Sequence, residues 1–104
     1  MRNKIFLAEF IGCAFLVMII VGSGIMAENL TNDTALMLIA NTLATGAGLF
    51  VLIASLADVS GAHFNPVVTT CMFFARKTKR KDLINYYTAQ ILGCMLGVML
   101  ANFM

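Results

Sequence analysis

The sequence predicts an all-α membrane protein with three transmembrane helices and a re-entrant loop that carries a half-membrane helix. Of its 104 residues, 61% are hydrophobic and 12% are charged, whereas a soluble domain is about 25% charged. Three apolar stretches reach the length of about 20 residues that crosses a bilayer as a helix. A fourth stretch is only half as long. The chain is short enough to form a single unit over residues 1–104.

The three long apolar stretches are expected to span the membrane. They cover residues 5–27, 35–57 and 83–104. Tyr86 and Tyr87 lie near the start of the third stretch, where aromatic residues are typical of the headgroup level. A signal peptide is the alternative for the first stretch, because Arg2 and Lys4 precede it. No small-residue cleavage pattern ends it, however, and Glu9 would be unusual near the start of a signal peptide.

The segment 58–75 is expected to form the re-entrant loop. Its apolar part, Pro66 to Ala75, would measure about 15 Å as a helix, which is half of the membrane. Asn65 is a favoured N-cap and Pro66 suits the first helical position, so a half-helix is predicted to begin there. Its free N–H groups and the positive end of its dipole would point toward the middle of the membrane. An ordinary loop between two helices is the alternative.

The basic residues predict how the chain is oriented in a plasma or inner membrane. They occur only at Arg2 and Lys4 and in the run 76–81, whereas the loop 28–34 contains acids and no base. Basic clusters beside apolar spans usually mark the cytoplasmic side. The N-terminus and 76–81 are therefore expected in the cytoplasm and 28–34 outside. The bilayer is the expected partner of the basic run, with nucleic acid as the disfavoured alternative.

Nothing in the sequence indicates an enzyme, because it contains no nucleophile–base pair, metal-binding cluster or phosphate-binding loop. No cofactor or metal is expected. The three cysteines, Cys13, Cys71 and Cys94, lie far apart within apolar stretches. Their spacing supports neither a disulfide framework nor a zinc site, so they are expected to pack as small hydrophobic residues.

Three motifs resemble those of the aquaporin and aquaglyceroporin family, the major intrinsic proteins. SGAHFNPVVT at 60–69 resembles the family's first signature loop, usually SGAHxNPAVT. AEFIG at 8–12 resembles its first-helix motif AEFxGT, and YYTAQILGCMLG at 86–97 resembles its third-helix pattern AQxxGA. The motifs occur in the right order and spacing over nearly the whole chain. The resemblance implies the N-terminal half of the family's fold, which is one of its two inverted repeats.

The resemblance assigns roles to the loop. It implies that Asn65 donates a hydrogen bond to the passing solute at the pore centre. It also implies that the carbonyl groups of the three residues before Phe64 form a ladder of acceptors; these are Gly61, Ala62 and His63. A metal-binding role for His63 finds no partner ligand in the sequence.

Other residues are expected to support the loop or the helix packing. An intramembrane carboxylate is a functional candidate by default, and the resemblance implies that Glu9 braces the loop backbone. The alternative is a helix-end residue that reaches the interface. Gln90 is expected to support the loop by hydrogen bonding, and Pro66 and Val67 are expected to support it from the start of the half-helix. Gly93 and Gly97 form a small-xxx-small pattern that favours close helix contact.

Two positions depart from the family pattern. Val67 replaces the usual alanine after the Asn65–Pro66 pair and is expected to alter how the half-helix meets a counterpart. Thr45 lies where the family generally has an aromatic residue that narrows the outer constriction. Because threonine is smaller and forms hydrogen bonds, a wider pore for uncharged polyols, urea or metalloid hydroxides is the expectation. A threonine that only packs is the alternative.

The resemblance implies a channel subunit that passes water or small uncharged solutes and excludes protons and ions. The chain carries one repeat, so a complementary half-chain or an oligomer is expected to complete the pore, with tetramers typical of the family. The basic residues on one side argue against an inverted homodimer. The alternative function is a non-conducting membrane scaffold or a truncated relic of such a channel.

Overall fold

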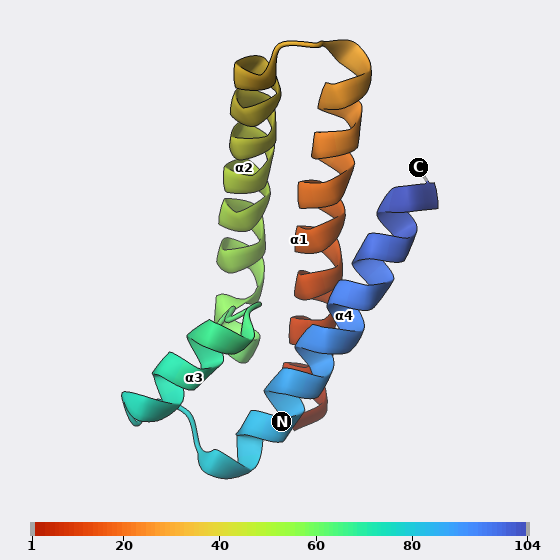
Figure 1. Ribbon diagram of the computed structural model, residues 1–104. Coiled ribbons are helices and arrows are strands. Elements are labelled where there is room, and N and C mark those ends of the chain that lie inside the picture. The colour runs from red at the N-terminus through yellow and green to blue at the C-terminus, as the bar shows by residue number, and fades with distance from the viewer. Residues whose placement is uncertain (1, 104) are drawn as a thin grey trace.

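The structure, a computed structural model, describes residues 2–103 and is helical throughout apart from its connections (Figure 1). Within this range the elements are α1 (Arg2–Leu30), α2 (Thr34–Ser60), α3 (Pro66–Phe74), the 3-10 helix η1 (Arg80–Asp82) and α4 (Leu83–Phe103). Three helices are long and apolar enough to cross a membrane. The prediction of an all-α membrane fold is therefore confirmed.

The helices begin and end at residues with clear local reasons. The Asp33 carboxylate caps α2 by accepting hydrogen bonds from the N–H groups of Ala35 and Leu36, at 2.9 and 3.3 Å. Gly61 ends α2 with a φ of 85°, in the left-handed region that glycine adopts without strain. Helix α2 therefore continues to Ser60, three residues past the predicted end of the second span at residue 57.

Helix α1 is the centre of the molecule. It packs against α4 on one side and α2 on the other, and α3 packs against α4. In Figure 1 the α1–α2 connection lies at the top of the molecule and α4 runs up toward that end, while the N-terminal end lies with the α3–α4 connection at the bottom. Helices α1 and α4 consequently run in the same direction along a molecule 47 Å long. The segment after α2 turns back, so α3 starts at the level of the α2 end and runs outward from it (Figure 1).

The interior of this fold is small and polar, while its surface is apolar. The largest side chains that are fully buried are those of Gln90, Glu9, Thr69 and Cys13. Large apolar residues such as Leu43, Phe50 and Phe103 are at least 69% exposed. This distribution suits a helical protein in lipid, where apolar side chains face the hydrocarbon and helices associate through small and polar residues.

The contact between α1 and α4, called here the α1–α4 seam, depends on two glycines. A Cβ atom at Gly93 would collide with the carbonyl oxygen of Phe10, and one at Gly97 would collide with that of Ala14. Both neighbours are backbone atoms, which cannot move aside independently. The predicted small-xxx-small pair thus lies where two helix backbones approach most closely, which explains why these positions lack a side chain.

Candidate functional site

The loop 61–65 has an unusual backbone that needs support from its surroundings. Three of its residues have positive φ values, 85° at Gly61, 53° at Ala62 and 52° at Phe64. This region is uncommon for residues other than glycine, and each such residue costs on the order of 1 kcal/mol. Neighbouring groups must therefore hold the loop in this shape.

Glu9 is the main support. Its side chain is fully buried, and its carboxylate accepts three hydrogen bonds. One oxygen accepts from the Phe64 backbone N–H at 3.0 Å and from Nε2 of Gln90 at 2.9 Å, and the other accepts from the Ser60 hydroxyl at 2.7 Å. Glu9 thus connects α1 to the end of α2, to the loop and to α4. All three contacts lie inside the fold, where the Glu9 carboxylate is not exposed.

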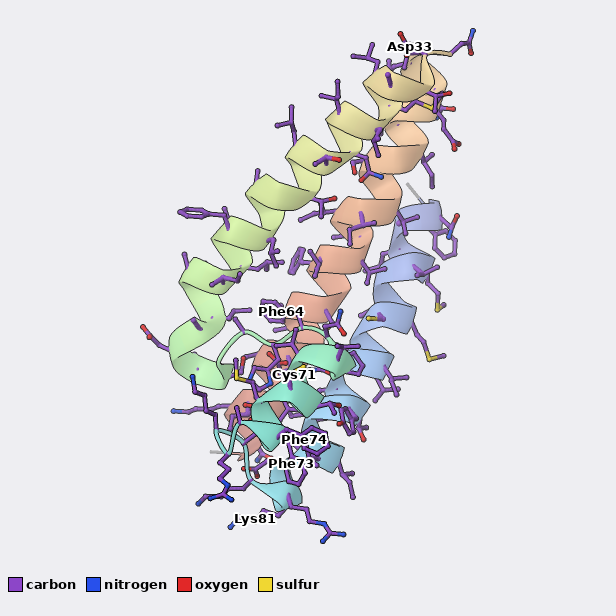
Figure 2. All side chains as sticks on the ribbon, turned by 60° about the vertical axis from the view of Figure 1, so that its left-hand side comes forward. Asp33, Phe64, Cys71, Phe73, Phe74 and Lys81 are labelled. Carbon is purple, nitrogen blue, oxygen red and sulfur yellow. The ribbon has the colours of Figure 1, made fainter. Side chains whose placement is uncertain are left out.

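Phe64 fixes the same loop by packing. It is 5% exposed, and its ring lies directly on Gly12, so that a Cβ atom at Gly12 would overlap three ring carbons. Figure 2 shows Phe64 where the loop meets α1. The loop is therefore attached to α1 through a backbone hydrogen bond to Glu9 and a ring contact with Gly12, one turn apart.

A second group of polar side chains connects the loop to α3 and α4. Nε2 of Gln90 also donates to the Thr69 hydroxyl at 2.8 Å, and that hydroxyl lies 3.0 Å from Nδ1 of His63. The His63 ring stacks on Tyr86 with 4.4 Å between ring centroids. Tyr86 in turn donates its hydroxyl to the Ser60 carbonyl at 2.6 Å. Predicted residues Glu9, His63 and Gln90 thus belong to one continuous network.

Asn65 begins α3 and remains exposed. Its Oδ1 accepts a hydrogen bond from the Val67 N–H at 2.8 Å, which is the capping contact expected of an N-cap residue. Because this contact fixes which side of the amide faces the helix, the Nδ2 group is turned outward. Within residues 2–103 no backbone N–H group donates to the carbonyls of Gly61, Ala62 or His63. Donor and acceptor groups therefore both remain available at the loop.

Pro66 and Val67, which were expected to support the loop, lie on the exposed side of α3. Val67 is 68% exposed. Both line an open groove of about 420 Å³ between α3 and α4, whose other lining residues include Thr70, Cys71 and Tyr87. The hydroxyl groups of Thr70 and Tyr87 form a hydrogen bond at this groove. Residue 67 therefore faces outward.

Thr45 lies apart from the loop network. Its hydroxyl donates to Oδ1 of Asn41 at 3.2 Å, and Ser23 on α1 donates to the same oxygen at 3.1 Å. These residues border a separate open groove of about 410 Å³, which Ile20, Thr42 and Gly46 also line. The structure thus places Thr45 in a polar contact between α1 and α2, at a different height of the molecule.

The sequence does not single out Gly12, Ser60, Phe64 or Thr69, and it predicts Tyr86 at the headgroup level, whereas the structure places it in the network. One of these residues has a detectable signal, because Tyr86 lies four residues before Gln90 and residues at this spacing share a helix face. The contact between Gly12 and Phe64 has no such signal, because it joins residues far apart in the chain.

Comparisons with known proteins agree with this geometry. Residues 2–104 match the family model described as major intrinsic protein. An aquaglyceroporin of Rhizobium meliloti, AqpS, is 48% identical over 97 residues, which are 93% of this chain and 42% of that protein. Aquaporin TIP1-2 of Musa acuminata is 39% identical over 93% of this chain and 40% of its own length. The glycerol uptake facilitator protein-like 6 of Lactiplantibacillus plantarum is 35% identical over 92 residues, which are 88% of this chain and 39% of that protein. The chain thus spans about two fifths of the length of these curated relatives.

Proposed function

The chain belongs to the major intrinsic protein family, and from this we propose that it supplies one half of a membrane channel for water or small uncharged solutes. The observation that carries the proposal is the braced loop 61–65 followed by the short helix α3. A loop at membrane depth must line a cavity or be buried in protein. The donor and acceptor groups of the loop are exposed, which favours a loop that lines a cavity.

The proposed pore contacts follow from the loop geometry. Nδ2 of Asn65 would donate to a passing solute, because Oδ1 of the same amide is occupied by the Val67 N–H. The carbonyl groups of Gly61, Ala62 and His63 would accept hydrogen bonds from it. The N-terminal end of α3 contributes a positive partial charge, which disfavours protons and other cations. Neutral hydrogen-bonding molecules are therefore the proposed solutes.

The class of solute is proposed from Thr45 and from the relatives. Two of the relatives are named an aquaglyceroporin and a glycerol uptake facilitator-like protein. A small hydroxyl residue at position 45 leaves a groove open beside it, bordered by Asn41 and Thr42. Glycerol-like polyols, urea and metalloid hydroxides are therefore proposed beside water.

Completion of the pore by a second unit is also part of the proposal. Asn65, Pro66 and Val67 are exposed on one side of the molecule, and polar groups that face lipid are costly. A complementary half-chain that covers this side would enclose the loop. A homo-oligomer is the second arrangement, and the one-sided basic residues disfavour an inverted pair.

Solute flux in proteoliposomes tests this function. The chain is reconstituted alone and together with a C-terminal half of a family member, and osmotic shrinkage and glycerol uptake are followed by stopped-flow light scattering. We expect flux above that of empty vesicles when both halves are present. The absence of flux in both preparations, with correct insertion shown by protease protection, would contradict a channel and support the scaffold alternative.

A pair of matched variants assigns any flux to the loop. Asn65→Asp keeps the oxygen that caps α3 but removes both N–H donors and adds a negative charge, so flux should fall at least tenfold. Asn32→Asp makes the same chemical change in the exposed α1–α2 connection and should leave flux unchanged. Equal flux through both variants would show that Asn65 does not contact the solute.

A further inference from the structure

The α1–α4 seam brings two cysteines together. Helices α1 and α4 run in the same direction (Figure 1), and Glu9 on α1 is hydrogen-bonded to Gln90 on α4. Cys13 and Cys94 each lie four residues further along these helices. One turn of both helices therefore leads from the Glu9–Gln90 pair to a Cys13–Cys94 pair, whose thiol groups interact with each other.

The helix backbones are unusually close at this turn. A Cβ atom placed on Gly93, the neighbour of Cys94, would lie 3.0 Å from Cβ of Cys13. A disulfide requires Cβ atoms about 3.5–4.5 Å apart, a separation that only closely packed helices offer. The seam thus provides the short backbone separation that a bond between the two sulfur atoms needs.

The two thiols differ in access. Cys13 is fully buried, whereas Cys94 is partly exposed. Cys71 is exposed on α3 and belongs to a different face. A reagent dissolved in the bilayer would reach Cys94 before Cys13.

We propose that Cys13 and Cys94 form an oxidisable dithiol that accepts small apolar disulfides and closes to a bond between α1 and α4. Cys94 loses its proton and attacks one sulfur of the reagent, breaking the reagent's S–S bond and releasing one thiol. The Cys13 sulfur then loses its proton and attacks the Cys94 sulfur, releasing the second thiol. Two protein thiols are oxidised, and one reagent disulfide is reduced to two thiols.

The Cys13–Cys94 disulfide would affect the contacts that support the loop. It would fix α1 against α4 one turn from the Glu9–Gln90 contact that holds the loop backbone. Because it would join positions about 80 residues apart in sequence, it would strongly restrict the unfolded chain. Oxidation should therefore raise the thermal unfolding midpoint and reduction should reverse the rise.

A dipyridyl disulfide tests the proposal, since each reaction step releases a coloured pyridinethione. The full chain in liposomes carries Cys71→Ser, which removes the exposed thiol. We expect release of two equivalents of pyridinethione, and the intact mass should show no pyridyl group left on the protein.

Two further variants separate the roles of the cysteines. With Cys13→Ser added, one equivalent of pyridinethione should be released and a pyridyl adduct should stay on Cys94. With Cys94→Ser added instead, release should slow at least tenfold, because Cys13 is buried.

Three results would overturn the proposal: a pyridyl group that persists on Cys94 when Cys13 is present, release that is equally fast without Cys94, or no reaction of the folded protein. Circular dichroism of each variant shows that its helices are intact. Thermal unfolding gives a separate reading, because the midpoint should rise on oxidation in the Cys71→Ser protein and stay constant when Cys13→Ser is added.

Discussion

The shape of the loop is determined by a few contacts between single residues. Phe64 has an unfavourable backbone φ of 52°. Two contacts with α1 hold it in place: its N–H group donates to the Glu9 carboxylate, and its ring packs on Gly12. Each contact depends on a residue of particular size or charge. Variants at these two positions should therefore separate the packing support from the hydrogen-bonding support.

Gly12→Ala should displace the Phe64 ring, because the added methyl group overlaps it. Overpacking costs about 1–3 kcal/mol, so the free energy of unfolding should fall despite the higher helix propensity of alanine. Gly46→Ala is the control, because nothing lies within 4 Å of a Cβ atom there; it should be neutral or stabilising by up to about 1 kcal/mol. Denaturant titration in micelles measures both, and equal effects would argue against the ring contact.

Glu9→Ala should lower the free energy of unfolding by on the order of 3 kcal/mol, because it leaves three buried donors without an acceptor. Glu9→Gln should cost much less. Its oxygen can still accept from Phe64 and Gln90, and its amide can donate to the Ser60 hydroxyl. Denaturant titration in micelles compares the free energies of unfolding of the two variants. Similar losses in the two variants would show that the charge of Glu9, and not its hydrogen-bonding geometry, supports the loop.

Motif residues were more accessible to prediction than their contacts. Glu9 is marked by its carboxylate within an apolar stretch and Asn65 by its place as a cap before Pro66, while the role of Gln90 is implied by the resemblance of its motif. Phe64 looked like an ordinary apolar residue, and its role depends on the absence of a side chain at Gly12, fifty-two positions away. Such a complementary pair becomes visible only when the two segments are placed together.

At the scale of elements, the α1–α4 seam is the most extensive contact between two helices of the fold, and it depends on the absence of side chains. Gly93→Ala and Gly97→Ala should each lower the free energy of unfolding by about 1–3 kcal/mol, because the new methyl group meets a backbone carbonyl. Gly24→Ala is the control, since its Cβ atom would lie 3.6 Å from Nδ2 of Asn41, an ordinary contact. A loss at Gly24 as large as at Gly93 would argue against a special seam.

The elements themselves could be predicted well because their causes are local. Helix α3 begins at Pro66 with Asn65 as its cap, as the sequence predicts. The predicted end of α2 falls three residues early, because the polar residue Asp58 interrupts the apolar stretch although Gly61 is the residue that terminates the helix. The packing of α3 on α4 and the separate position of Thr45 depend on tertiary contacts, which no local pattern contains.

At the scale of the whole molecule, the charges predict how the protein is inserted. Asp33 and Lys81 lie at opposite ends (Figure 2), and the bases of 76–81 lie at the end where the N-terminal residues lie (Figure 1). In a chain without its native cysteines, Asn32→Cys should react with an impermeant maleimide from outside the cell, and Lys79→Cys only after permeabilisation. The opposite pattern would reverse the proposed orientation.

Changing the basic run should alter this orientation. Replacing the five bases of 76–81 by glutamine removes most of the charge difference between the two ends, so both cysteine positions should become partly reactive from outside. The matched control replaces Lys4 alone, which leaves the run intact and should preserve the pattern. An unchanged pattern in the first variant would show that the apolar spans themselves determine insertion.

Among the long helices, α2 packs mainly on α1, with one hydrogen bond from Tyr86 of α4 at its C-terminal end, and none of the residues in its most apolar stretch is buried. We therefore expect molecules on its other sides to contribute to the free energy that keeps it in place. Association with such neighbours stabilises a fold by mass action. The stability of this chain should accordingly depend on how many copies or partners share a given area of bilayer, and dilution with lipid should loosen α2 before it loosens the α1–α4 seam.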